Sequence, residues 1–235
     1  MKFSFTNLAW DKKDENKVLS FLKKNKINFI EYSTYKLCGN RTTKKELFKI
    51  KKKYSNRHIQ LYSMQSLLFN VEDAYIFGKK YQQNIFVSEI IKKIKIAKIL
   101  GTKVLVFGSP SNKNKFGKSL KFCDQIMVKF LRKISKICML NKINFCIEPN
   151  PKEYGCEYLA NTSHAIKLIK KVNHPNIKLN FDLGSTIMNN ENYKKILIKN
   201  IDLIGHIQIS APKLKGITRI KSKALNFLKF LKILG

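Results

Sequence analysis

The sequence predicts an α/β protein of the (β/α)8 TIM-barrel type, with seven strands visible and the eighth missing at the C-terminus. Apolar runs of strand length alternate with longer amphipathic stretches, which is typical of a parallel sheet. Three runs end in polar side chains, and these runs are INFCIEPNP (143–151), IKLNFDLG (177–184) and LIGHIQISAP (203–212). Such an arrangement delivers polar groups to one end of a barrel.

The expected strands are short apolar segments bounded by polar or glycine-containing loops. In chain order they cover residues 2–5, 27–32, 58–64, 103–107, 143–148, 177–182 and 204–210. The fourth is rich in β-branched residues and is closed by Gly108, Ser109 and Pro110. Strands that alternate with helical stretches in this way argue for a parallel sheet.

The expected helices are the stretches with apolar residues at helical spacing, such as Val18, Leu19 and Leu22 in the first. They cover residues 15–24, 44–52, 86–100, 120–140, 163–172, 193–199 and 223–234. Gly101 is placed to end the third helix, because glycine enters the left-handed region at little cost. Gly235 would cap the last helix in the same way.

The composition is that of one folded domain spanning residues 1–235, with 44% hydrophobic residues and no linker or repeat. No apolar run approaches the roughly 20 residues of a membrane helix. The N-terminus lacks the layout of a signal peptide. Five scattered cysteines without a CxxC pair indicate reduced thiols and a cytoplasmic protein.

The net charge of +32 raises the possibility of a polyanionic partner. However, only four of the 47 basic residues are arginine, and the lysines spread over nearly every helix. Sites built for phosphates or base edges favour arginine forks. We therefore interpret the charge as compositional drift on solvated faces and expect no nucleic acid partner.

The seventh strand and its helix are followed by the end of the sequence, where a barrel would place an eighth strand. An open seven-stranded sheet leaves two unpaired edges, which proteins normally avoid. We therefore expect a C-terminally incomplete barrel: either the sequence is a fragment, or another segment or subunit covers the gap. Exposed edges also make a homo-oligomer plausible.

Glu148 and Asp182 are the strongest pair of candidate site residues, because each follows a buried strand. They lie 34 positions apart, about one strand–helix unit, so they are expected on neighbouring strands. Two buried carboxylates at one barrel mouth require a cation or a set of donors, and oxygen ligands suit Mg²⁺ or Mn²⁺. The alternative is that each caps the following helix or pairs with a lysine.

Several stretches together resemble the sugar phosphate isomerase/epimerase family with the xylose isomerase-like TIM barrel. They are NFIEYSTYKL (28–37), QLYSMQSLLFN (60–70), VLVFGSPSNK (104–113), CIEPNPKEYGCEYL (146–159), NFDLG (180–184) and GHIQISAPKL (205–214). The resemblance implies a (β/α)8 fold, a sugar or sugar phosphate substrate, and a divalent metal. Mn²⁺ or Mg²⁺ is expected, with Zn²⁺ or Co²⁺ as alternatives.

The resemblance assigns roles position by position. Glu148 matches a glutamate that binds metal and serves as acid/base, and Asp182 matches an aspartate ligand. Relatives carry a motif like HxHISEP where this chain has His206-Ile-Gln208-Ile-Ser-Ala211-Pro, so Gln208 stands in the third ligand position. Ser185 stands where many relatives have histidine. The fourth ligand, a glutamate on strand eight, is absent.

The mechanism implied by the family is metal-assisted proton transfer next to a carbonyl, with two carboxylates on opposite faces of the substrate. Only Glu148 of that pair is visible. We therefore expect weak activity or none unless the missing strand is supplied.

Further candidates for substrate binding follow the other strands. They are His206, Glu31, Gln65, Ser109, Asn112 and Glu153. Glu31 could equally be a surface charge in a loop, and Gln65 could equally cap a turn. Ser109 and Asn112 lie in a lysine-containing loop that could contact a phosphate, although it lacks the glycine pattern of a P-loop. Cys146 alternates with Glu148 along its strand and is expected in the core.

Two other functions stay open. A catalytically impaired or truncated barrel acting as a non-enzymatic protein would explain Gln208, Ala211 and the missing strand. An apurinic endonuclease-like DNA enzyme shares the barrel and suits the basic charge. That class holds several metals with many histidines, and this chain has four histidines in total.

Overall fold

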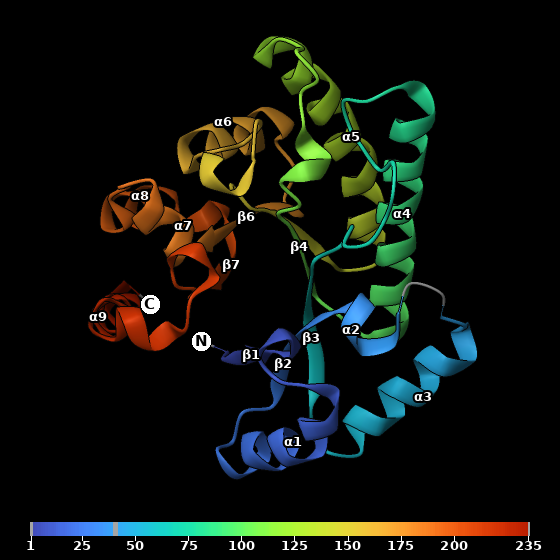
Figure 1. Ribbon diagram of the computed structural model, residues 1–235, viewed down its shortest axis with the longest axis vertical. Coiled ribbons are helices and arrows are strands. Elements are labelled where there is room, and N and C mark those ends of the chain that lie inside the picture. The colour runs from blue at the N-terminus through green and yellow to red at the C-terminus, as the bar shows by residue number, and fades with distance from the viewer. Residues whose placement is uncertain (1, 40–41, 235) are drawn as a thin grey trace.

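The computed structural model describes residues 2–39 and 42–234. Its described part contains one sheet of parallel strands, arranged in the sheet in the same order as in the chain. The strands are β1 (Ser4–Thr6), β2 (Phe29–Ser33), β3 (Gln60–Gln65), β4 (Val104–Phe107), β5 (Asn144–Ile147), β6 (Ile177–Asp182) and β7 (Ile204–Gln208). The sheet curls into a half-barrel (Figure 1). The predicted fold class and the seven strands are thereby confirmed.

The helices lie outside the curled sheet (Figure 1). They are α1 (Glu15–Lys24), α2 (Thr34–Cys38), α3 (Lys44–Ser55), α4 (Lys80–Leu100), α5 (Leu120–Leu140), α6 (Thr162–Val172), α7 (Leu183–Met188), α8 (Tyr193–Asn200) and α9 (Lys221–Leu234). The bounds of α1, α5 and β6 agree with the prediction. The short helices α2 and α7 were not predicted, and α4 begins six residues earlier than predicted.

Side-chain caps explain several helix boundaries. Thr43 and Glu46 form a capping box that begins α3, and the Ser119 hydroxyl accepts the Phe122 amide to begin α5. Gly101 ends α4 with φ at 82°, as its position in the sequence predicts. Because Gly235 lies outside the described residues, its expected role as a cap is untested.

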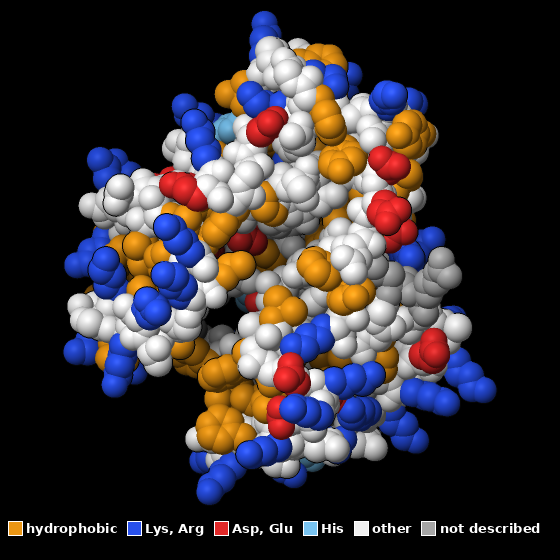
Figure 2. Space-filling view, viewed as in Figure 1, with side chains coloured by type: hydrophobic (Ala, Val, Ile, Leu, Met, Phe, Trp, Pro, Cys, Tyr) orange, Lys and Arg blue, Asp and Glu red, His pale blue; other side chains and the backbone are white. Residues whose placement is uncertain are grey.

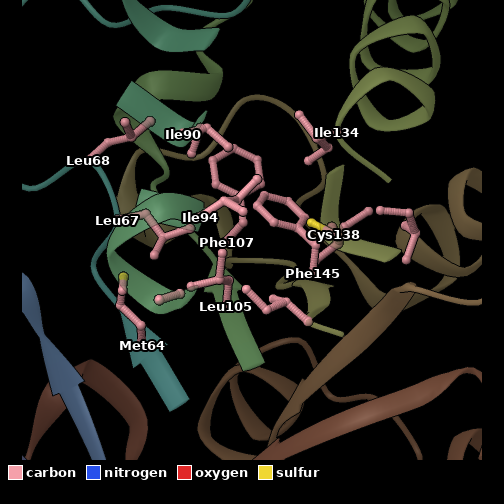
Figure 3. Close-up of a cluster of buried hydrophobic side chains, with 14 of the residues drawn as sticks. Met64, Leu67, Leu68, Ile90, Ile94, Leu105, Phe107, Ile134, Cys138 and Phe145 are labelled. Atoms are coloured by element: carbon pink, nitrogen blue, oxygen red, sulfur yellow. The ribbon is translucent and has the colours of Figure 1, made fainter. Parts of the chain in front are cut away.

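The main core lies between the outer face of the sheet and the long helices α4 and α5 (Figure 3). Phe107 and Phe145 face outward from β4 and β5, and Phe86 packs edge-on against Phe107 at a centroid distance of 5.7 Å. A second cluster joins the C-terminal elements, where Phe181 stacks on Phe227 of α9 at 5.7 Å. These two cores hold the strands whose ends carry the polar residues.

The inner side of the sheet is apolar near its centre. Val104, Val106 and Cys146 form a small buried cluster there, which agrees with the predicted core role of Cys146. At a register shift in β7, Gly205 comes so close that an added Cβ would lie 2.8 Å from the Cys146 sulfur. Glycine is therefore needed where β7 bends over the interior.

The edge strands face an open side of the half-barrel. Within the described residues β1 pairs only with β2 and β7 only with β6, and Figure 1 shows β7 and α9 across the gap from β1. Large apolar side chains are exposed nearby, including Phe3 and Phe5 in and beside β1 and Leu225 in α9. No helix in the described ranges has the length and apolarity needed to cross a membrane.

Candidate functional site

Three acidic side chains converge inside the half-barrel at the carboxyl ends of its strands. Glu31 lies in β2, Glu148 follows β5 directly, and Asp182 is the last residue of β6. The negative charges of Asp182 and Glu31 both raise the pKa of Glu148, so the three groups are close enough to interact electrostatically. Figure 2 shows acidic side chains in the central hollow of this face, whereas lysine and arginine cover its outer surface.

Glu31 is buried and accepts three hydrogen bonds. The Ser63 hydroxyl donates to Oε2 at 2.9 Å, and His206 Nε2 lies 2.8 Å from the same oxygen. Gln208 Nε2 donates to Oε1 at 2.7 Å. Burial opposes ionisation of Glu31, but the contact with His206 and the other hydrogen bonds hold its pKa below the usual value. Glu31 is thus an interior anion that joins β2 to β7, and the alternative of a surface charge is wrong.

Asp182 is the N-cap of α7 and one of its oxygens is fully engaged. Oδ2 accepts the Ser185 amide at 2.9 Å, the Ser185 hydroxyl at 2.8 Å and the Ser210 hydroxyl at 3.0 Å. The alternative that this carboxylate caps the following helix is therefore correct. Its other oxygen, Oδ1, is buried and has no hydrogen-bond partner in the described parts of the chain. A buried carboxylate oxygen of this kind suits a cation.

Glu148 has the most perturbed carboxyl group of the site. Burial and the nearby charge of Asp182 raise its pKa to about 8, although the positive charge of Lys113 opposes this effect. Asn150 Nδ2 donates to Glu148 Oε1 at 3.0 Å and orients the carboxyl group. Gly108 leaves room for the other oxygen, because a Cβ there would lie 2.7 Å from Oε2. Near neutral pH, Glu148 can therefore both give and take a proton.

Lys113 belongs to the site although the sequence analysis did not select it. It ends the 3-10 turn Ser111–Lys113 after β4, it is fully buried, and its ammonium group donates to the Glu148 carbonyl oxygen at 3.2 Å. The same group donates to Asn150 Oδ1 at 3.0 Å. In a chain so rich in lysine, the signal that could have found it is its position in the loop directly after a barrel strand.

Gln208 uses both ends of its amide within the protein. Its Oε1 accepts from Asn180 Nδ2 at 2.7 Å, while its Nε2 donates to Glu31. Its assignment as a metal ligand remains a prediction that would need the Oε1 atom to accept a second partner. The register pairs Gln208 with Asp182 across β6 and β7, which places it at the right level of the barrel.

The donors present fit a hard divalent cation better than a histidine-rich metal site. Among the described residues no group of three or more His, Cys, Asp and Glu side chains is arranged to hold a metal. Glu148 and the unpartnered Oδ1 of Asp182 provide two carboxylates instead. Mg²⁺ and similar ions are often held by one or two carboxylates and retain waters or substrate oxygens as their other ligands.

Four predicted substrate-binding residues remain, and the structure shows their local contacts and exposure. Gln65 donates to the Thr6 hydroxyl at 2.6 Å and ties β3 to β1. Asn112 is buried and donates to the Ala74 carbonyl, so its side chain fastens a loop. Ser109 is half-buried with φ at 46°, and Glu153 is exposed at the surface. Substrate contacts by these four residues stay predictions.

Parallel strands curled into a half-barrel, with acidic groups at their carboxyl ends, define a TIM-barrel-like α/β protein. The family model described as xylose isomerase-like TIM barrel matches residues 19–221. The chain therefore belongs to this family. No curated protein matches the chain by sequence.

Solved structures share the fold at low sequence identity. An AP endonuclease of family 2 from Brucella melitensis has a TM-score of 0.76 at 14% identity, with coverage of 100% of this chain and 90% of that chain. D-psicose 3-epimerase, solved with D-fructose, has a TM-score of 0.72 at 15% identity and coverage of 89% and 73%. The IolI protein with a bound zinc atom has a TM-score of 0.68 at 18% identity and coverage of 89% and 72%. At these identities the likeness establishes the fold alone.

Proposed function

We propose that the chain is an isomerase or epimerase acting on a sugar or sugar phosphate, by proton transfer at a carbon next to a carbonyl. The observation that carries this proposal is the carboxyl group of Glu148, whose pKa is raised to about 8 by burial and by Asp182. A general acid or base works best when its pKa lies near the working pH. The position of Glu148 at the carboxyl end of β5 is where this fold holds its catalytic groups.

The proposal includes a divalent cation, Mn²⁺ or Mg²⁺, held by Glu148 and by Oδ1 of Asp182. When bound, such a cation polarises a carbonyl and stabilises the negative charge that develops on its oxygen. The unpartnered Oδ1 atom supports this assignment, because a buried carboxylate oxygen is costly without a partner. A zinc atom in the IolI protein supports metal binding within the fold.

The protein's own groups would orient the reaction. Asn150 holds Glu148 through one oxygen, so the other oxygen is directed past Gly108 into the interior. There it would remove a proton from the substrate and return it. His206 lies at the acidic cluster with its imidazole held by Glu31, which suits a hydrogen bond to a sugar hydroxyl. Five free thiols agree with a reducing, cytoplasmic setting.

A second candidate is a barrel that keeps the pocket but has lost catalysis. The observation that favours it is the engagement of Gln208, whose amide is held by Asn180 and Glu31 instead of being free for a ligand. A DNA-processing role has less support. Of the four histidines only His206 contacts the acidic cluster, whereas His164 bonds to Asp124 between helices.

The test measures exchange of hydrogen for deuterium at the carbon next to the carbonyl. The protein is incubated in D2O with Mn²⁺ and a panel of ketoses, aldoses and their phosphates, and deuterium incorporation next to the carbonyl is followed by NMR. We expect slow exchange with wild type and its loss with Glu148→Gln. Glu89→Gln on α4, which removes a surface contact with Lys92, is the matched control and retains activity. The absence of exchange with every sugar would favour the non-catalytic candidate.

A further inference from the structure

Lys113 is an unusual lysine in this protein. Together with Lys93 it is one of the two buried lysines in the described parts of a strongly basic chain. Burying an ammonium group is costly unless acceptors surround it. Lys113 has two of them, the Glu148 carbonyl oxygen and Asn150 Oδ1, and its ammonium group also lies 5.6 Å from the centre of the Phe107 ring. Burial lowers the pKa of the Lys113 ammonium group, and the nearby carboxyl group of Glu148 opposes this effect.

Asn150 connects this cation to the carboxyl group of Glu148. Its side-chain oxygen accepts from Lys113, and its side-chain nitrogen donates to Glu148 Oε1. One amide therefore separates the ammonium group from the carboxylate. The positive charge of Lys113 lowers the pKa of Glu148 against the larger opposing effects of burial and Asp182, so the two groups interact electrostatically.

The negative charge of the site has few other partners. Ser185 and Ser210 donate neutral hydrogen bonds to Asp182, and His206 is committed to Glu31. Oδ1 of Asp182 has no hydrogen-bond partner among the described residues. The nearby positive charge that acts on Glu148 is that of Lys113. A fixed cation nearby is a simple way to offset the negative charge of such a pair.

We propose that Lys113 is a built-in counter-ion of the Glu148 carboxylate, positioned through Asn150, and that it weakens the binding of a divalent cation at Glu148 and Asp182 by supplying part of the cation's charge. Lys113 is a positioning residue, because its burial keeps it from touching a substrate. The inference rests on the proposed function only in taking these two carboxylates as the cation site.

The experiment compares Mn²⁺ affinity, measured by the EPR signal of free Mn²⁺, in wild type, Lys113→Met and Lys93→Met. Methionine keeps the length and volume of lysine while removing the charge. We expect Lys113→Met to bind Mn²⁺ at least about tenfold more tightly, because like charges repel strongly at a buried site. Lys93→Met removes the other buried ammonium, which bonds to Thr34, and should leave the affinity unchanged.

Two further variants separate charge from shape. Lys113→Gln also removes the charge and should tighten Mn²⁺ binding, whereas Lys113→Arg keeps the charge and should retain the wild-type affinity. Far-UV circular dichroism identifies the folded variants. Loss of the fold in both neutral variants would overturn the proposal, since a counter-ion that only tunes cation binding is replaceable by a neutral side chain of similar volume.

The outcomes distinguish this inference from the proposed function. If wild type binds no Mn²⁺ at millimolar concentration but Lys113→Met does, the metal-dependent reaction fails in this chain and the counter-ion role stands. Equal affinities in wild type and Lys113→Met overturn the counter-ion role and leave the reaction open to the sugar assay. Failure of every variant to bind Mn²⁺ overturns both.

Discussion

Replacing Glu31 by glutamine tests whether the interior anion holds β2 and β7 together. The carboxylate accepts from Ser63, His206 and Gln208. Glutamine keeps the shape but offers one acceptor oxygen and an NH2 group, so at least one buried donor loses its acceptor. That loss costs about 1–3 kcal/mol, and weakening the remaining charge-assisted bonds costs about 1 kcal/mol each.

The expected destabilisation of Glu31→Gln is therefore about 3–5 kcal/mol, which matches the usual cost of removing one partner of a buried pair. For a domain of this size it lowers the melting temperature by roughly 6–20 °C. The pH dependence has a definite sign. Because the pKa of Glu31 is lowered in the folded protein, its contribution is present above about pH 4.3 and is lost as the pH falls through the folded pKa.

Urea unfolding at pH 7 and near pH 4 measures both effects. We expect a large gap between wild type and Glu31→Gln at pH 7, and a smaller gap near pH 4. Glu89→Gln, which breaks a partly exposed pair with Lys92, should change stability by less than about 1 kcal/mol. Equal unfolding free energies for wild type and Glu31→Gln at pH 7 would refute the reasoning, because a buried anion with three partners cannot be neutral to stability.

Two further substitutions test the interior. The pKa of Glu148 is raised to about 8, so its ionisation destabilises the folded state increasingly between about pH 4.3 and pH 8. Glu148→Gln should remove this loss and, in urea titrations, be more stable than wild type by about 5 kcal/mol at pH 8.5 but by only about 1 kcal/mol at pH 5. Gly205→Ala would bring a Cβ within 2.6 Å of the Lys178 Cβ, and should lower stability by about 1–3 kcal/mol in thermal melts. Gly216→Ala, whose Cβ would meet only the Thr218 hydroxyl at 3.7 Å, is its control.

Local sequence patterns predicted the bounds of those helices that have a clear apolar periodicity or a terminal glycine. The bounds of α1 and α5 follow from apolar residues at helical spacing, and Gly101 ends α4 as expected. The prediction placed the start of α4 at Phe86 instead of Lys80, because the first turn of the helix is mostly polar and shows no apolar periodicity. The short helix α7 was missed because its first residues continue the apolar run of β6, and only the capping side chain of Asp182 separates them.

The candidate site was predictable only where chemistry and position along a strand coincide. Glu148 and Asp182 follow buried strands, and both lie in the interior as expected. The partners of Glu31 could not be found in this way, since His206 lies 175 positions away and only the curvature of the sheet brings it close. Lys113 was hidden among many lysines, because burial of one lysine depends on the packing of a loop that sequence periodicity does not describe.

The hydrogen bond between Glu31 and His206 also has a consequence for synthesis of the chain. His206 is the 175th residue added after Glu31, and at about 5–20 residues per second the ribosome needs roughly 9–35 s to reach it. During that time the carboxylate remains in water, because its histidine and glutamine partners do not yet exist. The contact that joins β2 to β7 can therefore form only after β7 has been made.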